Sequence, residues 1–277
     1  MANVGVVVVT YRSASLVGEC LPSLRAASRN PIEVVVVDNA SPDGSVDAAR
    51  TADPAAVVIS HPTNAGYGAA NNIGLAALDP NTKFVLFANP DTVWPPGALD
   101  ALIGHVDDSV GLVSPTLVNR GGDVQPIGED DLRLGAVLRG MTRLGPPIRP
   151  RVVYGENEWL HTAAALVPIG VVRALGGFDE RFFLFAEDAD FCRRVRALGK
   201  RVVMAPDVRV EHIGGASMDA SHDADALAGM RTRAVATYLE KYDGKLARRA
   251  FGAVGTVVYG LGGHRGQARE AWRALTR

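Results

Sequence analysis

An acidic residue placed directly after an apolar run is the first feature of this chain that could do chemistry. The triplet Asn-Pro-Asp at 89–91 follows residues 84–88, whose composition is typical of a strand buried on both faces. In a parallel sheet Asp91 would lie at the carboxyl edge, where open α/β sheets bind ligands. A carboxylate there can share a divalent cation with a diphosphate. An Asn-Pro turn is also a common structural feature, so the triplet indicates a binding site only together with the other motifs of the chain.

Polar side chains also follow the two apolar strands predicted at the start of the chain. Residues 4–9 lead into Thr10, Tyr11 and Arg12, and residues 33–37 lead into Asp38. Parallel neighbours bring these ends to one edge, where a carboxylate can accept the N3–H of a pyrimidine and a hydroxyl can meet base or ribose. The competing interpretation is that Asp38 simply begins a turn.

A glycine-rich segment at 64–72 leads into a small-residue helix and contains Asn64, Gly66 and Asn71. Helix N-termini attract anions, and small residues allow close approach of the backbone to a phosphate. The spacing of Gly66 and Gly68 also fits a loose dinucleotide-binding pattern. That fingerprint belongs at the first strand–helix turn, which has no glycine here, so a nicotinamide cofactor is disfavoured.

Two further segments carry titratable side chains. Glu187 and Asp188 begin a predicted helix after the aromatic run 182–185, and His212 follows the last predicted strand. Acids at a helix start stabilise the macrodipole without any function, but a carboxylate beside apolar rings can also act as a general base. A lone histidine is more often structural than metal-binding.

The elements that must position these groups alternate in type along the first 95 residues. Strands are predicted at 4–9, 33–37, 56–60 and 84–88, with helices at 13–28, 44–50 and 67–77. This order indicates βαβ units and a mostly parallel sheet. Residues 128–158 form a long loop with a short helix, as binding loops and lids often do. Later elements are predicted at 110–119, 124, 159–168, 169–175, 187–199, 202–203 and 208–210.

Charge is distributed unevenly in this chain of 277 residues. The formal net charge is −1, which gives no global field for nucleic acid. Residues 227–277 nevertheless hold ten Lys or Arg against three acids, which indicates a basic helical appendage at 221–277 on an acidic body at 1–220. Such a segment could contact an anionic membrane surface, form a homodimer interface, or present a solvated helical face.

Cysteine content and hydropathy also indicate the cellular compartment in which the protein would be found. Cys20 and Cys192 lack metal-ligand spacing and a disulfide framework, which suits a reducing environment. The sequence shows no signal peptide and no apolar run of about 20 residues. We therefore expect a cytoplasmic protein, at most peripheral to the inner face of the membrane.

Taken together, the motifs resemble the family 2 inverting glycosyltransferases of the GT-A fold, particularly the bacterial rhamnosyltransferase-like branch. The resemblance covers the first strand to about residue 217. The matching stretches are VVTYR at 8–12, VDNASPDGS at 37–45, NAGYGAANN at 64–72, NPD at 89–91, GGFDERFF at 176–183, EDADFC at 187–192 and EH at 211–212. It implies an α/β fold with a Rossmann-like nucleotide-binding half at 1–95 and an acceptor half at 96–220.

The resemblance also implies roles for single residues. Asp38 would contact the base, Asp91 would be the metal-binding carboxylate of the D-x-D motif, Asp188 would be the base, and His212 would complete coordination of Mg²⁺ or Mn²⁺. The nucleotide site would comprise Thr10, Tyr11, Arg12, Asp38, Asn64, Gly66, Asn71 and Asn89. The acceptor region would include Trp159, His161 and Glu187.

Two departures refine what the resemblance implies. Asn89 replaces the first acid of D-x-D, as in the rhamnosyltransferase-like branch, which favours a dTDP-linked deoxysugar such as rhamnose as donor. The segment at 160–164 lacks the Ser-Gly turn common in relatives that act on lipid-linked sugars. The acceptor is accordingly left open between a saccharide, a lipid-linked saccharide and a small molecule, with polysaccharide or cell-wall biosynthesis as the setting.

Two other functional classes remain open at the level of sequence. A sugar-phosphate nucleotidyltransferase would need a glycine-rich basic loop after the first strand, where only Arg12 is basic. A non-catalytic nucleotide-sugar-binding protein would not need both Asp91 and Asp188.

Overall fold

The computed structural model describes residues 3–129, 131–144, 150–213 and 224–276 of the chain. Its main sheet has nine strands in the order β3-β2-β1-β4-β10-β6-β11-β5, with β8 paired to β11. These strands are β1 (Val4–Thr10), β2 (Ile32–Asp38), β3 (Val57–Ser60), β4 (Phe84–Ala88), β5 (Thr92–Val93), β6 (Val110–Val118), β8 (Gly155–Glu156), β10 (Ala164–Pro168) and β11 (Arg201–His212). A second, two-stranded sheet pairs β7 (Gly128–Glu129) with β9 (Trp159–Leu160).

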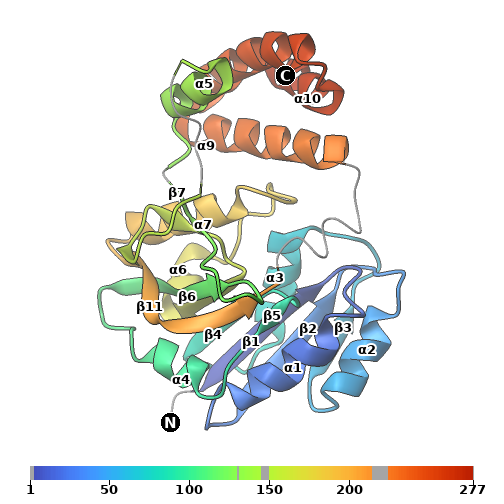
Figure 1. Ribbon diagram of the computed structural model, residues 1–277, viewed down its shortest axis with the longest axis vertical. Helices are drawn as coiled ribbons and strands as arrows, with labels where there is room; N and C mark the ends of the chain where they lie inside the picture. Colours follow the sequence, from blue (N-terminus) through green and yellow to red (C-terminus); the bar gives the residue numbers. More distant parts are fainter. Residues whose placement is uncertain (1–2, 130, 145–149, 214–223, 277) are drawn as a thin grey trace.

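Helices flank this sheet and cover its hydrophobic strands (Figure 1). They are α1 (Val17–Ala26), α2 (Ser45–Ala52), α3 (Tyr67–Ala77), α4 (Ala98–Ile103), α5 (Leu134–Thr142), α6 (Ile169–Leu175), α7 (Glu187–Ala197), α9 (Ala224–Leu261) and α10 (Arg265–Thr276). Every residue of β1 is buried, as its β-branched run predicts for a strand covered on both faces. The predicted α/β architecture with a mostly parallel sheet is confirmed.

One strand in the middle of the sheet runs against its neighbours. β1, β2, β3 and β4 are parallel, whereas β10 is antiparallel to β4, with Ala164 opposite Ala88 and Pro168 opposite Phe84. The start of β10 therefore lies beside the end of β4. This pairing carries the residues before β10 to the edge that holds Asp91.

The two strands predicted near 202–203 and 208–210 are one strand, β11. Its pairing with β6 shifts register between Ala205 and Arg209, where Pro206 cannot donate a ladder hydrogen bond. The strand bends there and resumes, so the sequence showed two apolar segments around an interruption. The prediction of two separate strands was wrong in this respect. The short helix expected within 128–158 is α5.

The C-terminal helices pack together and against the body. α9 changes direction at Gly244, whose φ of 85° and ψ of 174° are not helical. Before this kink Tyr238 belongs to the main core, and after it Phe251 packs in a second cluster with Val137 and Ala274. In Figure 1, α5, α10 and the last part of α9 form the top of the molecule. No helix within the described ranges is both long and apolar enough to cross a membrane.

Candidate active site

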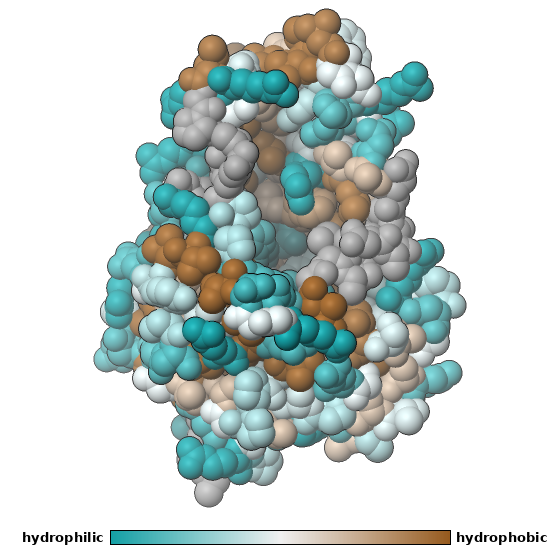
Figure 2. Space-filling view, viewed as in Figure 1, coloured by the Kyte–Doolittle hydropathy of each residue, from teal (hydrophilic) through white to brown (hydrophobic). Residues whose placement is uncertain are grey.

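A cavity of about 1230 Å³ opens between the carboxyl edge of the sheet and the C-terminal helices (Figure 2). Most residues predicted to form a site line it, although they come from distant parts of the sequence. These are Tyr11, Asn64, Gly66, Asn89, Asp91, Trp159, His161, Glu187, Asp188 and His212. Among the described residues, Thr10, Arg12, Asp38 and Asn71 do not line it.

Strand pairing brings His212 to Asp91. β11 is antiparallel to β5, with His212 opposite Thr92, and the amide of Ile213 donates a hydrogen bond to the Asp91 carbonyl at 2.9 Å. His212 Nε2 then lies 3.4 Å from Asp91 Oδ1. The carboxylate is 5% exposed, and Oδ1 accepts no hydrogen bond from any residue that the structure describes.

Gln125 orients the His212 ring. Its amide nitrogen donates to the His212 carbonyl oxygen at 2.8 Å, so its Oε1 faces His212 Nδ1 at 2.7 Å and accepts that proton. In the neutral ring with its proton on Nδ1, Nε2 would turn a lone pair toward the carboxylate oxygen. Two electron-rich atoms facing each other in a buried place suit a cation between them.

Asp91 and His212 fit a divalent ion whose other ligands come from a bound molecule. Within the described ranges there is no cluster of three or more His, Cys, Asp or Glu side chains able to hold a metal alone. One carboxylate and one imidazole leave an octahedral ion to be completed by phosphate oxygens and water. Asp91 and His212 thus match an ion that arrives with a diphosphate.

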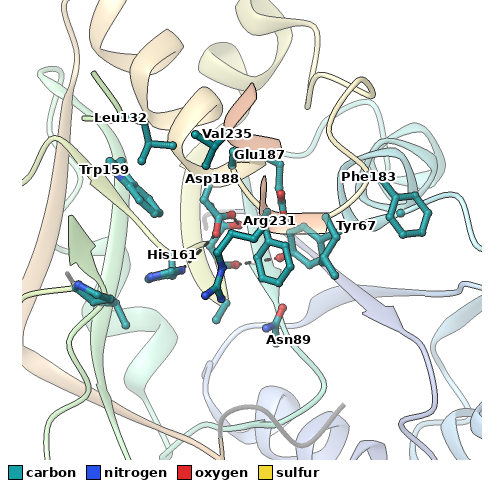
Figure 3. Close-up of a pocket in the computed structure, with 18 of the residues that line it drawn as sticks. Tyr67, Asn89, Leu132, Trp159, His161, Phe183, Glu187, Asp188, Arg231 and Val235 are labelled. Atoms are coloured by element: carbon teal, nitrogen blue, oxygen red, sulfur yellow. Dashed lines mark hydrogen bonds and ion pairs between the residues drawn. The ribbon is translucent and has the colours of Figure 1, made fainter. Parts of the chain in front are cut away.

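Asp188 lies at the start of α7, half-buried, and is held by two neighbours in the loop before β10 (Figure 3). The Thr162 hydroxyl donates a hydrogen bond to Oδ1, and His161 Nδ1 lies 3.6 Å from Oδ2. Tyr67 fixes this loop by donating its hydroxyl to the Thr162 carbonyl at 3.0 Å. A carboxylate positioned by these contacts and open to a cavity can accept a proton from a bound hydroxyl.

Glu187 precedes Asp188 but meets a different environment. It is 5% exposed, and its Oε2 accepts or donates no hydrogen bond within the described part of the chain. Burial, and secondarily the charge of Asp188, raises the pKa of Glu187 well above its ordinary value. The start of α7 thus places a buried carboxyl, whose pKa is raised, directly beside the half-buried Asp188 that faces the cavity.

The backbone before α7 has an uncommon conformation. Phe185 and Ala186 both have positive φ, 71° and 62°, which for non-glycine residues is strained and often marks a functional site. Gly66 packs directly against Phe183, just before this segment. A Cβ at position 66 would stand 2.3 Å from the Phe183 carbonyl oxygen. Tyr67 donates its amide to that same oxygen at 2.9 Å. The glycine-rich segment therefore holds the loop that presents Glu187 and Asp188.

The residues predicted to contact a nucleobase make structural contacts. Asp38 is 1% exposed, and its two oxygens accept hydrogen bonds from the Thr10 hydroxyl and the Ser41 amide, each at 2.9 Å. Its neighbour Asn39 lines the cavity instead. A base contact from Asp38 stays a prediction.

Three other predicted nucleotide-site residues also bond to the protein itself. The Arg12 amide donates to Ser41 at 3.0 Å, and the Asn71 side chain donates to the Tyr67 carbonyl at 3.0 Å. The Asn89 amide donates to the Ala163 carbonyl at 2.7 Å, which joins the turn after β4 to the loop before β10.

Sequence reasoning missed several cavity residues. Thr162 and Gln125 act through contacts that no motif announces, and Arg231 and Val235 enter from α9, which was expected to be an appendage. Arg231 is one of many basic residues in the C-terminal region, so the composition of that region did not single it out. Its spacing of four from Val235 on one helical face was the only indication available.

Comparison with known proteins places this geometry in a family. Residues 5–163 match the family described as "Glycosyl transferase family 2". The chain is 31% identical over 232 residues to N-acetylglucosaminyl-diphospho-decaprenol L-rhamnosyltransferase of Mycobacterium tuberculosis, which covers 75% of each protein. It is also 31% identical to the pre-mycofactocin glycosyltransferase of M. tuberculosis, over 76% of this chain and 42% of that protein.

Solved structures share the fold at lower identity. A mannosyltransferase from Pyrobaculum calidifontis, in complex with GDP-Man and Mn²⁺, superposes with a TM-score of 0.61 at 21% identity, over 98% of this chain and 73% of that one. Residues 1–349 of S. aureus TarS, in complex with UDP-GlcNAc, give 0.57 at 19% identity, over 93% and 73%. With a GT-A arrangement and the family match over more than half its length, this chain belongs to glycosyl transferase family 2 and is a glycosyltransferase.

Proposed function

We propose that this enzyme is a metal-dependent, inverting glycosyltransferase that moves a deoxysugar from a nucleoside diphosphate to an acceptor hydroxyl in a single displacement. One observation carries the proposal: the Asp91–His212 pair and the Asp188 carboxylate open into the same cavity. A leaving diphosphate and an attacking hydroxyl need these two kinds of group at one centre.

On the donor side, Asp91 and His212 would hold Mg²⁺ or Mn²⁺ together with the diphosphate. The ion would neutralise charge on the leaving phosphate oxygens. Gln125 keeps the His212 ring in the orientation and tautomer that coordination requires. Asp91 Oδ1 accepts no hydrogen bond from the described residues, which supports this assignment, as does the Mn²⁺ named in the P. calidifontis complex.

On the acceptor side, Asp188 would take the proton of the attacking hydroxyl. Thr162 and His161 position its carboxylate, and no covalent sugar–enzyme intermediate is needed because the hydroxyl attacks the anomeric carbon directly. Trp159, His161 and Glu187 would contact acceptor or donor hydroxyls beside Asp188. Attack from the face opposite the diphosphate inverts the anomeric centre.

The donor that fits best is dTDP-rhamnose or another dTDP-deoxysugar, from the Asn-Pro-Asp triplet and the rhamnosyltransferase relative. That relative's name includes a decaprenol-linked diphosphate substrate, so a lipid-linked saccharide is the acceptor class that we propose. The enzyme would then work from the cytoplasm at the inner face of the membrane. Exposed Leu246, Leu261 and Trp272, at 81%, 87% and 55%, together with Lys245 and Arg249, support peripheral contact there.

A panel of nucleotide sugars tests the donor assignment. The protein is incubated with each sugar in Mn²⁺ or Mg²⁺, with and without saccharide acceptors, and released nucleoside diphosphate is measured. We expect the largest release from dTDP-rhamnose, dependence on the metal, and a product of inverted anomeric configuration by NMR. Release from a UDP- or GDP-hexose alone would contradict the deoxysugar donor, and undiminished release in EDTA would contradict the metal.

A further inference from the structure

The C-terminal helix α9 is fastened to the helix that carries the predicted base. Lys241 on α9 pairs with Asp179 at 2.7 Å and with the fully buried Asp190 on α7, two residues after Asp188. Tyr242 donates its hydroxyl to the same Asp190 at 2.7 Å. The first part of α9 is therefore held in a defined position beside the active site.

From this position α9 places a positive charge in the catalytic cavity. Arg231 is exposed and lines the cavity with Asp188 and Tyr67 (Figure 3). Its Cζ lies 4.7 Å from the centre of the Phe185 ring, in the strained segment before α7. Among residues that the structure describes, it has no ion pair and no hydrogen bond. By contrast, Arg233, Arg248 and Arg273 of the C-terminal helices each pair with a glutamate, and none of these three lines the cavity.

The same cavity also has apolar walls. Five apolar residues form these walls: Leu132, just before α5, Val137 and Met141 on α5, and Val235 and Val258 on α9, before and after its kink at Gly244. Figure 2 shows hydrophobic colour inside the hollow between the body and the upper helices. A sugar that bound only by its hydroxyls would leave these walls exposed to water, at a cost that grows with the apolar area.

We propose that Arg231 binds a phosphate of the acceptor and that the apolar walls hold a hydrocarbon chain attached to that phosphate. This deepens the proposed function and rests on it, since it assigns the two parts of the acceptor to residues of this chain. The guanidinium offers paired N–H donors that match phosphate oxygens, and its contact with Phe185 keeps the fork oriented. The cavity thus combines a carboxylate, a guanidinium and apolar walls, which would serve the sugar, the phosphate and the hydrocarbon chain of such an acceptor.

Binding of citronellyl phosphate and citronellyl diphosphate, measured by titration calorimetry with saturating dTDP and Mn²⁺, tests the proposal without knowledge of the sugar. We expect saturable binding of at least one of them, and at least tenfold weaker binding of citronellol and of inorganic diphosphate. Comparison of the two probes tells whether one or two phosphates are recognised. No saturable binding of either probe to a protein that binds dTDP would overturn the proposal and leave the donor assignment standing.

Matched variants locate the two subsites. Arg231→Ala should weaken the citronellyl probe about tenfold or more, as loss of a charge-assisted hydrogen bond does, while Arg249→Ala, an exposed change on the same helix, should not. Val258→Asp on the cavity wall should weaken it similarly, whereas Val257→Asp, 59% exposed and outside the cavity, should not.

The affinity for dTDP is measured separately on every variant, which distinguishes an effect on the acceptor site from an effect on the donor site. A parallel loss of dTDP affinity in Arg231→Ala would assign the guanidinium to the donor diphosphate and overturn the proposal. Equal effects of the Val257 and Val258 changes would remove the chain site. Arg231→Lys, which keeps the charge but not the fork, should bind the probe with intermediate affinity, and its thermal melting shows that the fold persists.

Discussion

Lys241 of α9 forms an ion pair with Asp190 of α7, whose carboxylate is fully buried. The same carboxylate also accepts hydrogen bonds from Arg194 and Tyr242, each at 2.7 Å. The pair joins the C-terminal helix to the start of the helix that carries Asp188. A segment that the sequence suggests is an appendage is thereby tied to the geometry of the active site.

Lys241→Met should destabilise the protein by about 3 kcal/mol, because removing one partner of a buried ion pair leaves the other charge uncompensated. Arg194 and Tyr242 remain on Asp190, so we expect the lower end of the usual range. Urea unfolding measures the change, and Lys245→Met, an exposed position nearby on α9, is the control. Equal stability of the two variants would show that the pair contributes nothing.

Asp188→Asn should lower the transfer rate by about 10²–10⁴-fold, which is the usual effect of losing a general base. The amide keeps the size of the side chain and leaves the Asp91–His212 region unchanged, so nucleotide affinity should change little. Steady-state transfer and titration with dTDP give the two numbers. Near-normal turnover would dismiss Asp188 as the base.

Asp91→Ala should lower nucleoside diphosphate affinity in Mn²⁺ and should make the remaining affinity insensitive to EDTA. Asp91 is the carboxylate of its turn, since Asn89 occupies the first acidic position of the motif. Calorimetry with dTDP, with and without metal, measures both effects. If Asp91→Ala bound dTDP as the native protein does in both conditions, the ion site would lie elsewhere.

His212→Ala should impair activity more at limiting than at saturating Mn²⁺, because in the proposed site the imidazole would contribute one ligand among several. Protons compete with the ion for Nε2, so lowering the pH should raise the Mn²⁺ concentration needed for half-maximal activity. This pH effect should be absent in His212→Ala. Gln125→Ala, which frees the ring without removing it, should lie between the native protein and His212→Ala.

Glu187→Gln should change how stability depends on pH. The folded state raises the pKa of Glu187 above its ordinary value of 4.5, so the proton is held more tightly in the folded chain than in the unfolded one. The resulting stabilisation is fully present below pH 4.5 and is lost as pH rises toward the folded pKa. The stability of Glu187→Gln relative to the native protein should therefore increase as pH rises above 4.5, and parallel melting curves would contradict this.

The fold was largely predictable because its first half consists of strongly patterned elements. The apolar runs that became β1, β2 and β4 carry their strand signal locally: β1 ends at Thr10, β2 ends at Asp38, and β4 ends at Ala88, directly before Asn89. The sequence could not show that β10 runs antiparallel between β4 and β6, since direction depends on connections through a long and irregular segment. Nor could it show that β11 continues through Pro206.

The candidate site was predictable where a motif contains the residue and not where packing supplies it. Asp91, Asp188 and His212 stand at element ends that topology brings together, so their meeting in one cavity follows from the order of strands. Gln125 and Thr162 depend on loops whose course no pattern fixes. Arg231 depends on how α9 docks, which is decided by ion pairs between residues far apart in the sequence.

The direction of β10 also determines where this site can vary. Because β10 enters the sheet beside the end of β4, the cavity receives residues after β1 and β4 from one half of the chain and residues before β10 from the other. Length and composition between 128 and 158 can therefore change while the turn that holds Asp91 stays as it is. Changes within residues 128–158 can therefore alter which acceptor is bound, while the Asp91 turn on the donor side stays unchanged.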